Sequence, residues 1–302
     1  MWINNSMKVE VEQDLYPSRG DNSGFIKRKE PIIYGTIEQF KNAQLDHKEV
    51  TFYKKNGYLI IENMFYFHEL NNCKNEAKKI NKFYLEESEN PEIIREIDSK
   101  IVRSVFNIHK TNEIFKKLCY SRKILNIAEA LLGSPTYIHQ SRMNCKDRFD
   151  GKGFYWHSDF ETWHSEDGMP NMRAVSCSIL LTDNNEFNGP LLLVPGSHKY
   201  FIQCPGKTPE AHYKHSLKKQ EYGVPTKDSI TKIIKKHGIT SFKAKAGSVI
   251  FFDCNIIHGS SDNLSPFPRY NLFFVYNSIY NKLISPYAGT KPRPEFIASR
   301  EH

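Results

Sequence analysis

The chain has 302 residues, 39% of them hydrophobic and 25% charged, which is ordinary for a soluble globular protein with a sizeable core. It holds no run approaching the ~18 apolar residues that a membrane span needs, and its first residues carry acids without the apolar stretch of a secretory signal. The formal charge of +8 comes mainly from residues 207–245, whose ten lysines and three acids predict a solvated basic lobe, since no nucleic-acid motif accompanies them.

The cysteines and aromatic residues narrow the class further. Six scattered cysteines without a Cys-x-x-Cys pair argue against a disulfide frame and against a zinc site. They predict reduced, buried thiols in a cytoplasmic protein. The missing apolar run and the missing nucleic-acid motif predict that it binds neither membrane nor nucleic acid. Aromatic residues make up 13% of the chain, which favours a β-sheet core over a helical bundle.

The N-terminal half is predicted to be mainly helical. Its elements, in chain order, are a polar arm at 1–30, a weak helix at 36–56, a short apolar strand at 58–61, and charged helices at 67–83 and 112–132. Gly57 is the expected C-terminal cap of the weak helix. Gly133 and Pro135 are expected to end the last helix.

After Pro135 the pattern changes from helix to strand. Runs rich in β-branched and aromatic residues alternate with Gly, Pro, Asn and Asp, and this spacing predicts an antiparallel sandwich or barrel. The predicted strands are residues 136–144, 154–158, 174–182, 191–194, 248–252 and 272–276. The lysine-rich stretch interrupts this series and holds an expected helix at 229–236.

No tandem repeat is visible, and the sequence predicts one α+β, mainly β domain over 1–302. Its parts are the arm (1–30), a mainly helical support (31–135), a β-core (136–285) with the lysine-rich insertion (207–245), and a C-terminal tail (286–302). The insertion has no predicted catalytic role, although a basic lobe attracts anionic small molecules by a weak long-range field.

The strongest local motif is FYWHSDFETWH at residues 154–164. On a strand, residues i and i+2 point to one face, so His157 and Asp159 are predicted to present an imidazole and a carboxylate side by side. His258 follows the apolar strand at 248–252 and supplies a third group. Two histidines and one carboxylate form the facial triad of non-haem Fe(II) oxygenases, which leaves three coordination positions open.

A His-x-Asp pair arises often by chance in a chain with twelve histidines, so a fourth residue matters. Arg269 lies shortly after His258 at the start of the next strand. A 2-oxoacid that chelates iron at one end needs a fixed cation for its far carboxylate, and arginine offers a planar two-donor fork. The set predicts an oxygenase that uses Fe(II), a 2-oxoacid and O2, with His157, Asp159 and His258 as the catalytic metal site.

These motifs resemble the ectoine hydroxylases of the phytanoyl-CoA dioxygenase superfamily. The run WHSDFETWH with EDGMP at 166–170 and MRA at 172–174 is longer than iron binding requires, so it carries the likeness. Further matches are DLYPSR (14–19), HQSR (139–142), NGPL (188–191), PGSH (195–198), HGS (258–260) and PRYNLF (268–273). The likeness extends from about residue 14 onward and implies a double-stranded β-helix, the jelly-roll or cupin-like core.

The resemblance also implies roles for individual residues. His157, Asp159 and His258 would hold Fe(II), and 2-oxoglutarate would be bound by Arg269, Asn144, Ser176, Ser260 and Phe106. The substrate residues would be Gln140, Arg142, Trp163, Ala174 and Phe273, with Phe154 and Phe252 completing the walls. Arg142 would pair with the ectoine carboxylate, and Trp163 and Phe273 would face its delocalised cation.

Several of these residues have a plainer interpretation. The aromatic ones equally suit the core of a jelly roll, Gln140 and Ser176 suit ordinary strand positions, and Arg142 suits a surface ion pair. His164 and His198 are not assigned as ligands, because His198 fits a structural turn. Glu161 is interpreted as a carboxylate that supports the metal-binding side chains from outside, or as a structural one.

The predicted activity is hydroxylation of ectoine to 5-hydroxyectoine with 2-oxoglutarate and O2 as cosubstrates. Three alternatives stay open: another small zwitterion as substrate, such as a free amino acid; a non-catalytic jelly-roll binding module; and a basic nucleic-acid binder. The binding module predicts no turnover of 2-oxoglutarate with any substrate, and the nucleic-acid binder predicts salt-sensitive retention on heparin. The family commonly works as a homodimer, but no pattern in these residues establishes an oligomeric state.

Overall fold

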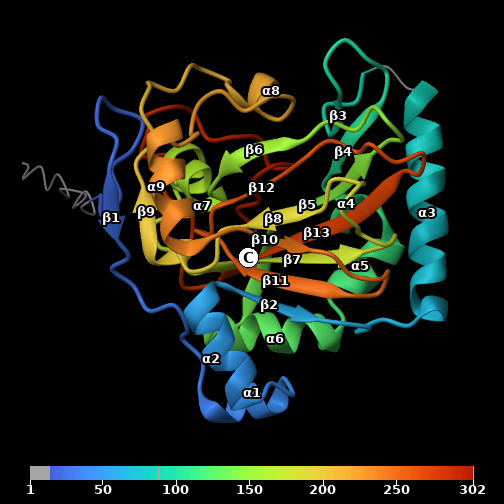
Figure 1. Ribbon diagram of the computed structural model, residues 1–302, viewed down its shortest axis with the longest axis horizontal. Helices are drawn as coiled ribbons and strands as arrows, with labels where there is room; N and C mark the ends of the chain where they lie inside the picture. The colour runs from blue at the N-terminus through green and yellow to red at the C-terminus, as the bar shows by residue number, and fades with distance from the viewer. Residues whose placement is uncertain (1–13, 87–88, 302) are drawn as a thin grey trace, which may run out of the picture.

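Two antiparallel β-sheets pack against each other in the computed structural model, which describes residues 14–86 and 89–301 (Figure 1). Apolar side chains from both sheets meet between them, for example Phe252 and Phe273 with Leu191 and Leu193. This arrangement is the expected jelly roll with helices on one side. Residues 1–13 of the predicted arm, residues 87–88 and His302 lie outside the described residues.

The larger sheet has seven strands within the described residues, in the order β2-β11-β7-β13-β5-β4-β3. Neighbouring strands pair antiparallel, and the long central pair β5 and β13 places Arg269 opposite Lys146. The strands are β2 (Tyr58–Ile61), β3 (Ile93–Arg95), β4 (Val102–Phe106), β5 (Thr136–Lys146), β7 (Ala174–Leu180), β11 (Val249–Asp253) and β13 (Arg269–Ser278).

The smaller sheet has the order β10-β8-β12-β6. Its strands are β6 (Phe154–His157), β8 (Leu191–Leu193), β10 (Thr240–Phe242) and β12 (His258–Ser260). A separate pair joins β1 (Phe25–Lys27) to β9 (Tyr200–Ile202), so the N-terminal arm is bound to the body through a strand.

Strand alternation divides the larger sheet into an apolar face and a polar face. On β7, Val175, Cys177 and Ile179 belong to the main hydrophobic core, and Ser176 and Ser178 point the other way. β5 repeats the pattern, because Met143 and Cys145 lie in that core while Gln140, Arg142, Asn144 and Lys146 face the space between the sheets. The polar interior of the jelly roll is therefore built by period-two alternation.

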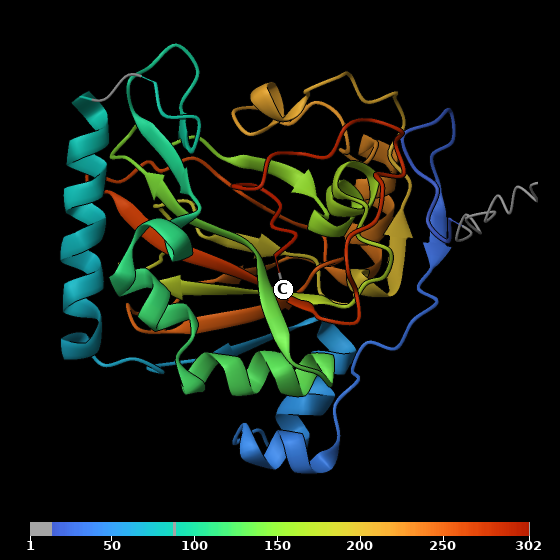
Figure 2. The same cartoon turned by 180° about the vertical axis from the view of Figure 1, so that it is seen from behind.

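Helices cover the apolar face, as the view from behind shows (Figure 2). On α6 the buried residues Ile124, Ile127, Ala128 and Leu131 recur at helical spacing and form one stripe. The helices are α1 (Ile37–Asn42), α2 (His47–Asn56), α3 (Phe67–Glu86), α4 (Ile108–Thr111), α5 (Glu113–Cys119), α6 (Arg122–Leu132), α7 (Asp159–Thr162), a π-helix (Trp163–Asp167), a 3-10 turn (Ser197–Lys199), α8 (Tyr213–Ser216) and α9 (Lys227–His237). None of the helices in the described ranges has the length and apolar character to cross a membrane.

Three sequence predictions for the N-terminal half need correction. The weak helix expected at 36–56 is two helices, α1 and α2, because Asp46 is extended and starts α2 as its N-cap. The helix expected at 112–132 is also two helices, because Ser121 is extended and starts α6 as its N-cap. The support at 31–135 also adds β2, β3 and β4 to the larger sheet. β3 and β4 were not predicted, because they are short and carry charged residues that hide their alternation.

The lysine-rich segment 207–245 confirms one expectation, since all ten of its lysines are exposed. It carries α8, α9 and β10, and its expected helix at 229–236 lies inside α9. Four other residues of this segment, Ser216, Leu217, Gln220 and Tyr222, line a cavity at the candidate site.

Gly57 offers a test of the turn between α2 and β2. Its φ of +82° is left-handed, its N–H donates to the Tyr53 carbonyl at 2.7 Å, and an added Cβ would overlap the ring of the buried His198. Gly289 also has a positive φ, of +70°, but open space around it. Gly289→Ala should cost about 1–2 kcal/mol of unfolding free energy, and Gly57→Ala should cost clearly more. Equal losses in urea unfolding would contradict the proposed overlap with His198.

Candidate functional site

Strand register in the smaller sheet brings two histidines together. β6 and β12 pair so that His157 lies opposite His258, and their ring centroids are 4.2 Å apart. Asp159 Oδ1 is 3.6 Å from His157 Nε2, and its Oδ2 is 3.8 Å from His258 Nε2. All three residues are buried, and one ligand atom from each lies within 4.8 Å of the others.

Asp159 reaches this group by a route that differs from the predicted one. β6 ends at His157, and Asp159 is the first residue of α7 rather than the next same-face residue of a strand. The strand alternation predicted for Asp159 is therefore wrong. The physical reason is that aspartate is unfavourable in strands and favourable in the first turn of a helix.

The tautomer of each histidine is set by a backbone carbonyl two residues earlier in the chain. His157 Nδ1–H donates to the carbonyl of Tyr155 at 2.6 Å, and His258 Nδ1–H donates to that of Ile256 at 3.0 Å. Each Nε2 is therefore left with its lone pair facing Asp159. Backbone carbonyls commonly fix metal-binding imidazoles in this way.

The electrostatics of the group suit a divalent cation. Burial, together with the neighbouring His157, lowers the pKa of His258 to about 4, so its imidazole is neutral at neutral pH. Burial raises the pKa of Asp159, but His258, His157 and Arg142 outweigh it and hold the pKa below its ordinary value. Two imidazole nitrogens and one carboxylate form a donor set that fits Fe(II).

Arg269 marks one end of the cavity beside this group. It is buried, its Nη1–H donates to the carbonyl of Gly189 at 2.7 Å, and its Nε has no hydrogen-bond partner in the described chain. Burial lowers the pKa of Arg269 to about 10, because no acid lies beside it. The same pocket is lined by His157, His258, Arg142, Asn144, Phe154, Leu191, Gly259, Ser260 and Phe273.

Lys146 is a buried cation at this end that the sequence analysis missed. Its Nζ donates to Ser260 Oγ at 2.9 Å and to the carbonyl of Ser261. Burial, with the nearby Arg269 and Arg103, lowers the pKa of Lys146 to about 6. Its signal lay in the alternation of β5, since Gln140, Arg142 and Asn144 lead by steps of two to Lys146.

Arg142 marks the other end. It forms no ion pair with any residue that the structure describes, so a surface ion pair does not explain it; its Cζ lies 5.1 Å from the centroid of the Phe273 ring. Gln140 Nε2 donates to the carbonyl of Ile297 at 2.8 Å, which leaves its oxygen as an acceptor. This second pocket is lined by Ser104, Phe106, Gln140, Arg142, Phe154, His157, Asp159, Thr162, Trp163, Glu166, Ser216, Leu217, Gln220, Tyr222 and Arg293.

Four expected site residues occupy other positions. Phe106 lines the Arg142 pocket rather than the Arg269 pocket, and Ala174 packs with Trp163 in a separate hydrophobic cluster. Phe252 lies behind His258, with ring centroids 5.3 Å apart. Ser176 is buried on β7 with no hydrogen-bond partner in the described residues and lines neither pocket.

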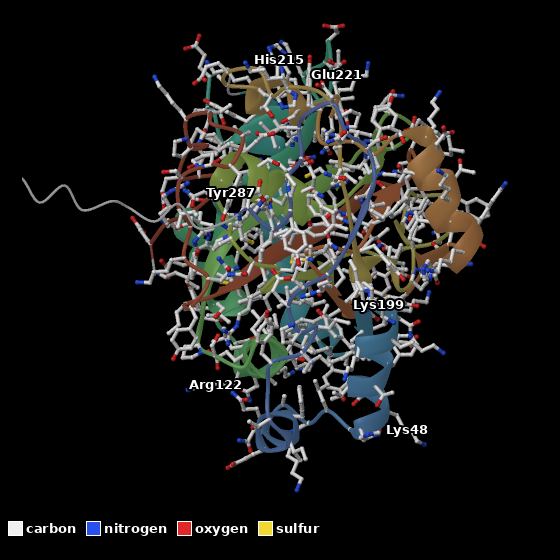
Figure 3. The ribbon with its side chains drawn as sticks, turned by 90° about the vertical axis from the view of Figure 1, so that its left-hand side faces the viewer. Lys48, Arg122, Lys199, His215, Glu221 and Tyr287 are labelled. Atoms are coloured by element: carbon white, nitrogen blue, oxygen red, sulfur yellow. The ribbon has the colours of Figure 1, made fainter. Side chains whose placement is uncertain are left out.

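Several lining residues had no sequence signal. Thr162 and Glu166 lie in the motif but were not assigned, and Arg293 comes from the predicted tail. Ser216 to Tyr222 come from the basic segment, which carries His215 and Glu221 at the edge of the molecule in Figure 3, above the C-terminal segment marked by Tyr287. Only the fold brings these distant segments to one cavity.

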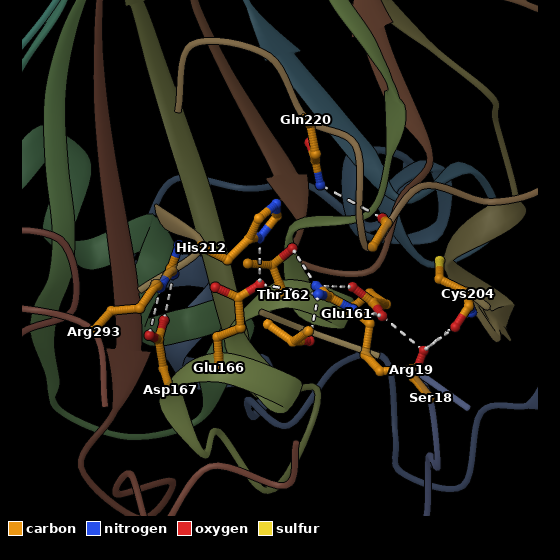
Figure 4. A network of polar contacts seen from close by, with 12 residues as sticks. Ser18, Arg19, Glu161, Thr162, Glu166, Asp167, Cys204, His212, Gln220 and Arg293 are labelled. Carbon is orange, nitrogen blue, oxygen red and sulfur yellow. Dashed lines mark hydrogen bonds and ion pairs between the residues drawn. The ribbon is translucent and has the colours of Figure 1, made fainter. Parts of the chain in front are cut away.

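Buried ion pairs hold α7 and the π-helix from outside (Figure 4). Arg19 donates to both oxygens of Glu161, at 2.7 and 2.8 Å, and its Nη1 lies 3.0 Å from Glu166 Oε1. Arg293 donates to both oxygens of Asp167, at 2.7 and 2.6 Å. Glu161 is thus a structural carboxylate, and the two arginines tie the N- and C-terminal segments to the helix that carries Trp163.

Comparison with known proteins gives one consistent result. The family model described as phytanoyl-CoA dioxygenase (PhyH) matches residues 53–271. The ectoine dioxygenase of Bordetella bronchiseptica is 50% identical over 300 residues, which cover 97% of this chain and 94% of that protein. That of Stutzerimonas stutzeri is 46% identical over 299 residues, covering 97% and 96%.

Solved structures agree with the sequence comparison. The crystal structure of EctD from S. alaskensis with 2-oxoglutarate and 5-hydroxyectoine matches with a TM-score of 0.85 and 38% identity over 95% of each chain. The same protein with bound Fe matches with a TM-score of 0.84 and 37% identity over 96% of this chain and 95% of that one.

The Asp167–Arg293 pair predicts a specific loss of stability in acid. Burial raises the pKa of Asp167, but Arg293 and His139 outweigh it and lower the pKa from 3.8 to about 2. The carboxylate therefore adds stability above pH 3.8, and this contribution is lost as the pH falls through about 2. Between about pH 4.5 and pH 2.5 the unfolding free energy should fall by ~2 kcal/mol more in the parent than in Asp167→Asn. Parallel urea-unfolding curves over that range would contradict the assignment.

Proposed function

The chain belongs to the phytanoyl-CoA dioxygenase family, and we propose that it is the member that hydroxylates ectoine to 5-hydroxyectoine with Fe(II), 2-oxoglutarate and O2. The observation that carries the proposal is a pair of arginines beside a His-Asp-His group, the half-buried Arg142 and the buried Arg269, neither of which forms an ion pair with the described residues. A dicarboxylate cosubstrate and a zwitterionic substrate would each bring one carboxylate to such a pair.

His157, Asp159 and His258 would hold the metal, because their donor atoms converge and each histidine uses Nδ1, not Nε2, for its backbone hydrogen bond. The chemistry that bound Fe(II) supplies is oxidative: 2-oxoglutarate and O2 become succinate and CO2, and one oxygen atom hydroxylates the substrate. The histidines contribute by keeping Nε2 unprotonated, since both Nδ1 protons are committed to backbone carbonyls.

The far carboxylate of 2-oxoglutarate would be bound at the Arg269 end. Arg269 offers its unpaired Nε–H, and Ser260 offers a hydroxyl proton because its oxygen already accepts from Lys146. Asn144 lines the same pocket and accepts from Ser104 at 2.9 Å, which orients its amide. The buried Arg269 cation favours a 2-oxoacid with a second carboxylate at its far end over one whose far end is uncharged.

Ectoine would be bound at the Arg142 end. Arg142 would pair with its carboxylate, because the other arginine in the same wall, Arg293, is already paired with Asp167. Gln140 would accept from a ring N–H through its free oxygen, and Trp163 would face the delocalised cation. Phe273 is less free for this role, because Arg142 already lies over its ring. The aromatic walls would keep water from the reacting carbon.

The proposal also covers the cellular location and the oligomeric state of the protein. A cytoplasmic location is supported by six cysteines that are all buried and unpaired. A homodimeric state is proposed from the family resemblance alone.

Turnover is the direct test of the activity. Protein loaded with Fe(II) should convert ectoine to 5-hydroxyectoine in a one-to-one ratio with succinate, in the presence of ascorbate and 2-oxoglutarate, and His157→Ala should abolish both products. Chromatography of both products gives the answer. Succinate without 5-hydroxyectoine would overturn the substrate and favour another small zwitterion. Iron-loaded protein that forms neither product would favour a non-catalytic binding module.

Replacing either arginine should raise the KM of a different compound in steady-state kinetics. Arg269→Met should raise the KM for 2-oxoglutarate by roughly tenfold or more and Arg142→Met the KM for ectoine, because each removes a charged hydrogen-bond donor worth ~1.5–3 kcal/mol. Arg148→Met is the matched control, since Arg148 is exposed and lines neither pocket. If both variants raise the same KM, the assignment of the two ends is wrong.

A further inference from the structure

A third cavity, of about 610 Å³, adjoins the candidate site. Small-molecule pockets typically measure ~300–1,000 Å³, so it can admit a small ligand. Its walls come from the β3–β4 connection, from the residues that lead into β6, and from the loop after α8. These elements lie at the same end of the molecule in both ribbon views (Figures 1 and 2).

The cavity adjoins both pockets of the site. It shares Phe154 and Ser260 with the Arg269 pocket, and Phe154, Ser216 and Gln220 with the Arg142 pocket. Phe154 is therefore the shared wall between the three spaces. Arg103 lies 3.8 Å above the Phe154 ring and is itself held by Glu96 at 3.1 Å, so the wall is supported from one side.

The outer part of the cavity is weakly positive and belongs to the most basic segment of the chain. Lys218 and Lys219 line it and are exposed; Lys219 lies 3.4 Å from Glu221, whereas Lys218 forms no ion pair with the residues described here. Lys152 lies 3.6 Å from Asp262 across the opening. The inner Arg103–Glu96 pair is neutral and Asp150 also lines the cavity, so the four cations of the lining exceed its three acids by one charge, which gives the field that a small anion meets its positive sign.

We propose that this cavity is the vestibule through which 2-oxoglutarate enters and succinate leaves the Arg269 end, with Phe154 as the partition and Lys218 and Lys219 as the attracting charges. The inference rests on the proposed use of 2-oxoglutarate. Both compounds are dianions, whereas ectoine is a zwitterion without net charge, so the basic opening favours the cosubstrate over the substrate. The vestibule also gives the lysine-rich segment a role beyond solubility.

Added bulk tests the route. Ile97 lines only the vestibule and is 53% exposed, so Ile97→Trp can narrow the passage without disturbing the core. Thr290→Trp is the matched control, because Thr290 lines a different cavity that adjoins the Arg142 pocket through Glu166 and Arg293. Stopped-flow tryptophan fluorescence would follow 2-oxoglutarate binding to the Fe(II)-loaded protein without O2.

Ile97→Trp should slow association and dissociation of 2-oxoglutarate severalfold and equally, leaving Kd unchanged. A narrowed passage raises the barrier without altering the bound state. Thr290→Trp should bind at the parental rate. Parental rates in Ile97→Trp, or slowing in Thr290→Trp alone, would overturn the vestibule.

Charge reversal tests the attraction. Lys218→Glu with Lys219→Glu should lower the association rate of 2-oxoglutarate by about tenfold at low ionic strength and weaken its salt dependence. Lys227→Glu with Lys235→Glu makes the same change in net charge on α9, outside the vestibule, and should have a much smaller effect. Equal slowing by both pairs would overturn a local role of the vestibule lysines.

The parent protein separates the two proposals. If it binds 2-oxoglutarate and the vestibule variants bind at the same rate, the vestibule is wrong and the proposed function stands. If the Fe(II)-loaded parent binds no 2-oxoglutarate, both are wrong.

Discussion

The site depends on one backbone register, the antiparallel pairing of β12 with β6. β12 has three residues and is held on both sides, with His258 opposite His157 on β6 and opposite Leu193 on β8. A slip of one residue would turn His258 to the other face of the sheet. Because each imidazole donates to a carbonyl two residues earlier in the chain, the same short segments that align the rings also set their tautomers.

The interior holds two kinds of buried cation, and the difference between them identifies the binding surfaces. Arg19, Arg28, Arg103 and Arg293 each contact a buried acid and so complete structural pairs. Arg142, which is half-buried, and Arg269, which is buried, form no ion pair with the described residues and line the pockets. Burying an unpaired cation is costly, and an anionic ligand offsets that cost when it binds. The protein thus keeps its uncompensated charge where ligand carboxylates are proposed to lie.

Distant parts of the chain enclose these pockets. Arg19 comes from the N-terminal segment and forms ion pairs with α7 and the π-helix that follow β6. Arg293 comes from the C-terminal segment and forms an ion pair with the π-helix. The C-terminal segment also binds β5, through Ile297 to Gln140 and through the Ser299 N–H to the His139 carbonyl at 2.8 Å. The π-helix that carries Trp163 is a rare geometry often found at functional sites, and these contacts hold it in position.

The sequence alone determined the features that rest on local chemistry. Apolar spacing and turn residues predicted most strands, the cap at Gly57 and the helix inside the basic segment. The His-x-Asp motif, the later His258 and Arg269 predicted the metal and cosubstrate chemistry. Tertiary structure alone decided which side chains share a cavity: Arg293, Ser216, Leu217, Gln220 and Tyr222 have no local signal, because their positions in the pocket follow from long-range packing. It also decided that Asp159 begins α7. Aspartate is favourable in the first turn of a helix, and from this position its carboxylate lies beside both histidines.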